Sequence, residues 1–225
     1  MVKMHDRELG LLEEIANLSF QEISNRYGIE LKKSKSVSHN FINAYLKSRV
    51  PIELIAIESP RLKIKTVGKS LKTGKCFESV SLRNVNFYNL STTDFWNSEL
   101  FKEIDSLVFL PIIKSSRDSD VKDWIVGSCR TLALDHEIIY RISEEYSLYR
   151  EFTVKLMRIF EKKGKFEMKR FWEDNFPRSS ETSIIHMRPH AKNRKDYDLS
   201  IEGFEITKHS FWFNKVFLNE FLLKI

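Results

Sequence analysis

The residues best suited to chemistry in this sequence lie in two basic clusters that contain no acidic residue. One cluster spans residues 61–75 and the other spans residues 188–195. Their basic members are Arg61, Lys63, Lys65, Lys69, Lys72 and Lys75, and Arg188, Lys192, Arg194 and Lys195. Charged runs are commonly plain solvated surface, but Gly68, Gly74, His190 and Asn193 within these runs favour contact with phosphate groups. With a net charge of +6, the clusters predict a polyanionic partner.

The second cluster belongs to a longer motif. Residues 186–193 read His-Met-Arg-Pro-His-Ala-Lys-Asn, and residues 206–214 read Ile-Thr-Lys-His-Ser-Phe-Trp-Phe-Asn. These two segments resemble the C-terminal motif of the MutH-like endonucleases, which act at GATC. Residues 62–67 resemble the family's catalytic strand, and residues 78–82, Trp96, Ser98, Leu100 and residues 107–113 follow in family order. The likeness covers most of residues 30–220 and is closest to the C-terminal half of the two-domain restriction enzymes.

The resemblance implies which residues read the DNA bases. In the family, a loop that begins with Arg-Pro reads GATC from the major groove, and this loop matches Arg188, Pro189 and His190. The guanidinium fork of arginine fits guanine O6 and N7, and an imidazole can donate to the same edge. Lys192 and Asn193 suit phosphate or adenine.

The last part of the motif departs from the family at one position. The tyrosine by which the mismatch-repair members sense adenine methylation is matched by Glu205. A carboxylate accepts from cytosine N4 or adenine N6, or faces solvent, so methylation sensing is not carried over.

We also expect DNA contacts from Lys208 and from the first cluster. The expected members there are Lys63, Lys65, Lys69 and Lys72.

The nuclease site implied by the family is incomplete here. Active members use an Asp and a Glu-x-Lys, in which the carboxylates hold Mg²⁺ and the lysine stabilises the attacking water or the phosphorane. Lys65 matches the lysine, but Lys63 occupies the Glu position and Ala56 the Asp position. Glu53 and Glu58 do not have the family's spacing. Two cations on one face of a strand repel Mg²⁺, so we predict a vestigial site without metal or catalysis.

Weaker constellations have simpler interpretations. Residues 19–29 faintly resemble the start of a helix-turn-helix, but the next expected helix begins too late. His186 and His190 have the spacing of a helical metal pair, yet Pro189 argues against a helix and no third ligand is evident. Three carboxylate pairs are expected to be surface groups rather than an acid–base dyad. These pairs are Asp94 and Glu99, Asp118 and Asp120, and Glu144 and Glu145.

The elements that must position these residues come in blocks. Apolar spacing predicts helices over 6–18, 20–28, where Ser19 and Glu22 form a capping box, and 37–47. Strands are predicted over 53–57, 61–67, 78–87, 107–113 and 123–129. A long helix follows over 136–163, then a strand near 183–188, a basic loop and a helix over 211–223. In that helix we expect the aromatic residues to form core or an interface rather than a base-stacking platform.

This order favours an α/β (α+β) fold, with a mixed central sheet flanked by helices and an N-terminal helical extension. The resemblance implies the MutH-like restriction-endonuclease fold, with a helical segment over 1–50 and a DNA-binding domain over 51–225. No apolar run approaches the roughly 18 residues of a membrane span, and the N-terminus lacks the pattern of a secretory signal. We therefore expect a cytoplasmic protein.

The sequence thus predicts binding of double-stranded DNA at GATC, as the recognition or allosteric effector half of a type II restriction endonuclease. We expect no cofactor for this chain. The expected partners are GATC-containing DNA and either a catalytic MutH-like half or a second copy of the chain. Two alternatives stay open. One is an active Mg²⁺-dependent endonuclease that uses Glu58 or carboxylates of a partner chain, and the other is a module that mainly docks a catalytic half.

Overall fold

The chain divides into two compact units, each assembled from segments that are distant in sequence. A computed structural model describes residues 4–32, 34, 36–49, 62–132, 135–193, 196–198, 200–201 and 203–223. The first unit comprises Met1–Glu78, Ser106–Ala133 and Asn219–Ile225, and the second comprises Ser79–Asp105 and Leu134–Leu218. The predicted boundary at residue 50 and the strand predicted over 53–57 lie outside the described residues, so the division into 1–50 and 51–225 stays a prediction.

The first unit is a mixed sheet with helices on one face. Its helices are α1 (Met4–Glu14), α2 (Phe20–Tyr27) and α3 (Val37–Arg49), and its strands are β1 (Lys63–Ser70), β3 (Leu107–Lys114), β4 (Ile125–Val126) and β5 (Arg130–Thr131). A short turn of 3₁₀ helix, η2 (Val121–Asp123), precedes β4. Strand β1 runs parallel to β3, whereas β4 and β5 are antiparallel to it. The mixed α/β character predicted from the sequence is confirmed.

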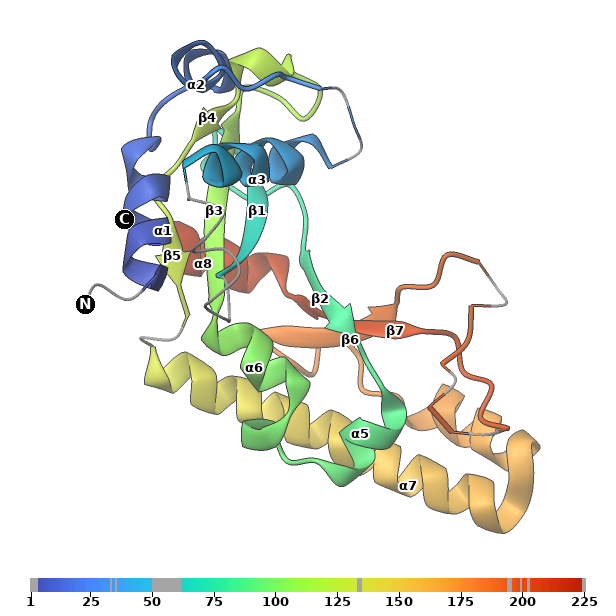
Figure 1. Cartoon of the computed structure of the whole chain (residues 1–225). Helices are drawn as coiled ribbons and strands as arrows, with labels where there is room; N and C mark the ends of the chain where they lie inside the picture. The colour runs from blue at the N-terminus through green and yellow to red at the C-terminus, as the bar shows by residue number, and fades with distance from the viewer. Residues whose placement is uncertain are drawn as a thin grey trace. The chain divides into compact units, whose positions relative to one another are not determined.

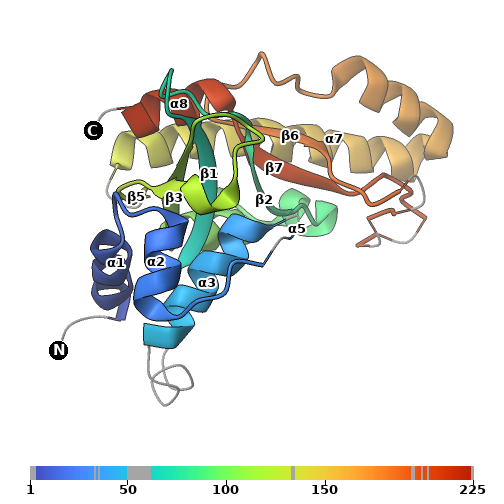
Figure 2. The same cartoon turned by 90° about the horizontal axis from the view of Figure 1, so that it is seen from above.

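Alternation along the strands explains this layering. Ile64 on β1 and Val108 and Leu110 on β3 are buried in the same core as the apolar residues of α1, α2 and α3. These three helices lie on one side of β1 and β3 (Figure 2). The predicted capping box is confirmed: Ser19 accepts from the Glu22 N–H at 3.2 Å and donates its own N–H to the Glu22 carboxylate at 2.7 Å.

The second unit is an antiparallel sheet in the order β2-β7-β6, formed by β2 (Val80–Asn84), β7 (His209–Phe213) and β6 (Ile185–Pro189). The long helix α7 (His136–Asn175) lies along this sheet (Figure 1). Tyr149 of α7 accepts the N–H of Met187 at 3.1 Å, and its ring meets Phe211 edge-on. The smaller helices of the unit are α5 (Phe87–Thr92), η1 (Phe95–Asn97) and α6 (Glu99–Asp105).

The prediction of a helix over 211–223 is wrong at its start. Residues 211–213 belong to β7, and helix α8 (Lys215–Leu223) begins only after Asn214. Phe211 and Phe213 are buried while Trp212 faces the other way, which is the two-residue period of a strand. A continuous aromatic run satisfies both the helical and the strand period, so the sequence pattern did not distinguish them.

Other boundaries also differ from expectation. Helix α7 extends beyond residue 163 to Asn175, across a break at Gly164, whose φ is 79° and ψ is −174°. Only glycine adopts such a backbone conformation readily. The strand predicted over 78–87 ends at Asn84, because Asn86 caps α5 by accepting the Asn89 N–H at 2.8 Å. Among the described residues, no helix has both the length and the apolarity needed to cross a membrane.

Candidate nucleic-acid interface

The pairing of β6 with β7 joins the two segments of the 186–193 and 206–214 motif. His186 is opposite Trp212, and Arg188 is opposite Ser210. Residues that face each other across an antiparallel pair lie on the same side of the sheet. These four side chains therefore share one face, while Met187 and its neighbours in alternation pack toward α7.

Arg188 is exposed on that face and rests on an aromatic ring. Its guanidinium carbon lies 3.6 Å from the centroid of the Trp212 ring, which is the geometry of a cation–π contact. A guanidinium that stacks through its face keeps its N–H donors at its edge, where they point away from the ring. The contact places the guanidinium over the Trp212 ring at the end of β6.

His190 is fixed beside the same ring by three contacts. Its ring meets Trp212 edge-on at a centroid distance of 5.1 Å, and its Nδ1 lies 2.9 Å from Ser210 Oγ. Ser210 in turn donates to Asn84 Oδ1 at 2.8 Å, and the backbone N–H of His190 donates to the Lys208 carbonyl at 2.8 Å. The imidazole is exposed, whereas Ser210 is buried. One edge of the imidazole is thus anchored in the sheet.

The loop after β6 is closed by Asp196. Its carboxylate accepts the backbone N–H of Lys192 at 3.0 Å and pairs with the Lys208 ammonium at 2.7 Å. These two partners, the Lys192 N–H first, hold the pKa of the Asp196 carboxyl below its ordinary value. The side chains of Lys192 and Asn193 are exposed at the tip of this turn, but the charge of Lys208 is already partly neutralised.

Glu205, which the resemblance matches to the methylation-sensing tyrosine, is exposed and forms an ion pair with Lys165 of α7 at 3.1 Å. An exposed ion pair contributes only about 0–1 kcal/mol, so a stronger partner displaces it at little cost. Contact between Glu205 and a DNA base stays a prediction.

The lysines of the first cluster do not all present their charge in the same way. Lys63, Lys65 and Lys69 alternate along one face of β1. The Lys69 ammonium donates to the carbonyl of Leu222 at 3.0 Å, where it satisfies one of the last carbonyls of α8. Lys72 is exposed in the turn after β1. Lys72 is therefore the better test of phosphate contact, because removing Lys69 would also weaken the helix end.

The positions predicted to form a vestigial nuclease motif are described only in part. Lys63 and Lys65 lie on β1 as expected, in register with Leu107 and Phe109 of β3. Ala56, Glu53 and Glu58 lie outside the described residues. Within the part of the chain that the structure describes, no group of three or more His, Cys, Asp or Glu side chains is arranged to hold a metal ion.

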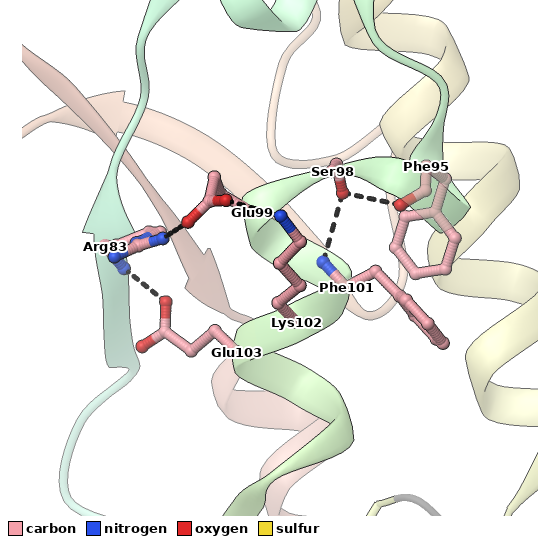
Figure 3. A network of polar contacts seen from close by, with 7 residues as sticks. All are labelled: Arg83, Phe95, Ser98, Glu99, Phe101, Lys102 and Glu103. Atoms are coloured by element: carbon pink, nitrogen blue, oxygen red, sulfur yellow. Dashed lines mark hydrogen bonds and ion pairs between the residues drawn. The ribbon is translucent and has the colours of Figure 1, made fainter. Parts of the chain in front are cut away.

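The carboxylates of Asp94 and Glu99 make structural hydrogen bonds and ion pairs. Asp94 caps η1 by accepting from the side chain and backbone of Asn97, which lowers the pKa of its carboxyl. Figure 3 shows Glu99 between Lys102 and Arg83, and hydrogen bonds from these two cations, Lys102 first, lower the pKa of Glu99. Carboxylates held ionised in this way are poor general acids, and the same network ties α6 to β2.

Two histidines of the motif are buried rather than presented. Burial lowers the pKa of the His186 and His209 imidazoles. His209 lies on the face opposite Trp212 and packs against the Trp172 ring at 5.1 Å.

The sequence analysis named neither Trp212 nor Ser210 as a candidate site residue, although both lie in the motif. Asn84 gave no signal at all, because it is far from the motif in sequence.

The Glu145 carboxylate on α7 stabilises the start of β6 through hydrogen bonds. Its carboxylate accepts the backbone N–H groups of Ser183, Ile184 and Ile185, the last at 2.7 Å. We expect Glu145→Ala to lower the free energy of unfolding by about 1–3 kcal/mol, because these donors lose a charged acceptor. Urea denaturation measures this change. Glu144→Ala is the matched control at an exposed neighbouring position and should change stability by less than about 0.5 kcal/mol. Equal losses would contradict the assignment.

No family model matches the chain, and no curated protein matches it.

Proposed function

We propose that this chain binds double-stranded DNA at GATC as the recognition or effector half of a MutH-like restriction endonuclease. The observation that carries the proposal is the pairing of Arg188 and His190 on the Trp212 ring, at the exposed end of β6. A guanidinium fork next to an imidazole is suited to hydrogen-bonding base edges in the major groove. The mixed α/β architecture is compatible with the MutH-like fold, which is part of the proposal.

The charge distribution supports contact with the DNA backbone. The turn that carries Lys192 and Asn193 adjoins the reading residues, and both side chains are exposed. Phosphate contacts from such groups fix the protein on the duplex, while base contacts supply the preference for sequence. Lys72, exposed on the first unit, has the character of a backbone contact.

Duplex binding at several salt concentrations tests this proposal. We expect the chain to prefer a GATC duplex over a scrambled duplex of the same composition, and to lose affinity for both as salt rises, because bound phosphates release counterions. Lys72→Ala should weaken both duplexes equally and reduce the slope of log K against log salt by about one.

Lys47→Ala removes the same charge from an exposed position on α3 and serves as the control. Equal affinity for the two duplexes would reject GATC recognition. Affinity that does not change with salt would reject a DNA role altogether.

A further inference from the structure

The hydrogen-bond chain behind His190 determines which nitrogen of its imidazole carries the proton. Asn84 Oδ1 is a carboxamide oxygen, which only accepts, so the Ser210 hydroxyl donates its single proton to it at 2.8 Å. Ser210 Oγ then has only lone pairs to offer His190 Nδ1, which lies 2.9 Å away. With the Asn84 oxygen facing Ser210, Nδ1 is the donor. A neutral His190 carries its hydrogen on Nδ1 and leaves a lone pair on Nε2.

We infer that His190 reads an exocyclic amino group of a base, adenine N6 or cytosine N4, through Nε2 as an acceptor. This inference rests on the proposed function and reverses the role expected from the sequence, in which the imidazole donates to guanine. In the major groove, guanine presents only the acceptors O6 and N7, whereas adenine and cytosine present amino donors. A lone pair on Nε2 is attracted to the amino groups and repelled by the guanine edge.

The neighbouring Arg188 makes the two roles complementary. The guanidinium only donates, and it lies on the same Trp212 ring that His190 touches. Residues two apart along an extended chain are about 7 Å apart, which is about two steps of a duplex with a rise of roughly 3.4 Å. Arg188 then serves a guanine while His190 serves a nearby adenine or cytosine. The GATC site contains all three bases.

The Ser210–Asn84 pair acts as a positioning device in this scheme, since neither residue needs to touch the DNA. Asn84→Ala removes the acceptor that directs the Ser210 proton away from Nδ1, so Ser210 can donate to Nδ1 and the imidazole proton is free to occupy Nε2. Asn84→Asp keeps an acceptor oxygen in place and is the matched control. Asn84 is exposed at the end of β2, so both substitutions leave the core intact.

The first measurement needs no DNA. Long-range ¹⁵N–¹H correlation spectra of the free protein at about pH 8, where an ordinary imidazole is neutral, separate a protonated ring nitrogen from one with a lone pair. We expect Nδ1–H for His190 in the native protein and in Asn84→Asp, and the appearance of Nε2–H in Asn84→Ala. Nε2–H in the native protein would overturn the inference, whatever the DNA experiments show.

The second measurement uses GATC duplexes with single base analogues. Purine replaces adenine and 2-pyrimidinone replaces cytosine, which removes the amino group, and 7-deazaguanine removes the N7 acceptor. We expect one of the two amino-free duplexes to bind the native protein about three- to tenfold more weakly, the effect of one hydrogen bond. Which duplex responds identifies the base. The same ratio should be near one in His190→Ala and Asn84→Ala and should be kept in Asn84→Asp.

Failure of the inference is distinguishable from failure of the proposed function. If the native protein prefers GATC but neither amino-free duplex weakens binding, the acceptor role is overturned and GATC recognition survives. If 7-deazaguanine weakens binding in the native protein but not in His190→Ala, the imidazole donates to guanine and the inference is wrong. If the native protein does not distinguish GATC from a scrambled duplex, the proposed function fails and the reading role of His190 fails with it.

Discussion

Replacing Arg188 with alanine is expected to weaken binding to GATC by about ten- to a hundredfold while binding to a scrambled duplex changes little. The guanidinium fork matches guanine O6 and N7 with two hydrogen bonds, and such a bidentate contact discriminates by roughly 1–3 kcal/mol. The side chain is exposed and its guanidinium lies over the Trp212 ring, which restricts its position before DNA binds. Its loss therefore removes preference more than general affinity.

Two further variants separate charge from shape at this position. Arg188→Lys keeps the charge but not the planar fork, so it should retain binding to the scrambled duplex without restoring the preference. Arg141→Ala removes an arginine from an exposed pair with Glu137 on α7 and should leave both affinities unchanged. If Arg188→Ala instead weakens both duplexes in parallel and lowers the salt slope by about one, the arginine contacts phosphate and does not read bases.

Sequence patterns predicted most of the elements, because their determinants are local. The capping box at Ser19 and Glu22 fixes the start of α2, and alternation in residues 63–67 identifies β1. The short helices α5 and α6 were missed, since each is too short to show a helical period. The helix predicted over 136–163 ends at the residue before the break at Gly164, but the helical segment that continues from there to Asn175 was not predicted.

The sequence predicted those residues of the candidate site that lie in one motif, but not the contacts that position them. Arg188 and His190 were predicted to be reading residues, but their contact with Trp212 depends on the register of β6 against β7. The contact between Ser210 and Asn84 joins residues 126 positions apart. Sequence spacing contains no information on such a pair. Without the Ser210–Asn84 contact, the sequence does not indicate which ring nitrogen of His190 carries the proton. Donation to guanine and acceptance from adenine are then equally compatible with the sequence.

The number of basic residues in the sequence also did not indicate which lysines have partners within the protein. A sequence treats Lys69, Lys72 and Lys208 as equal cations, whereas the structure shows that two of them have partners. Lys69 donates to the end of α8 and Lys208 pairs with Asp196, while Lys72 lies exposed in a turn. The share of each lysine in binding polyanions follows from these partners and not from the net charge.

In DNA cleavage we expect the largest difference between this chain and an active MutH-like endonuclease. The chain alone should not linearise a GATC-containing plasmid in the presence of Mg²⁺. Lys63 and Lys65 lie on the same face of β1, so a cation stands where the family's metal-binding glutamate would be. Loss of one preorganised charge-stabilising group typically costs about 10²–10³-fold in kcat. Replacement of a ligand by a cation should cost at least as much.

Plasmid linearisation followed over time measures this, with an active GATC-cutting enzyme on the same plasmid as the positive control. Lys63→Glu should not create activity, because the motif's second carboxylate position is Ala56 and still supplies no ligand for Mg²⁺. Mg²⁺-dependent cutting that co-purifies with the native chain and disappears in Lys65→Ala would contradict the prediction. Such a result would mean that Lys65 still works beside carboxylates from Glu58 or from a partner chain, which is the arrangement of an active endonuclease.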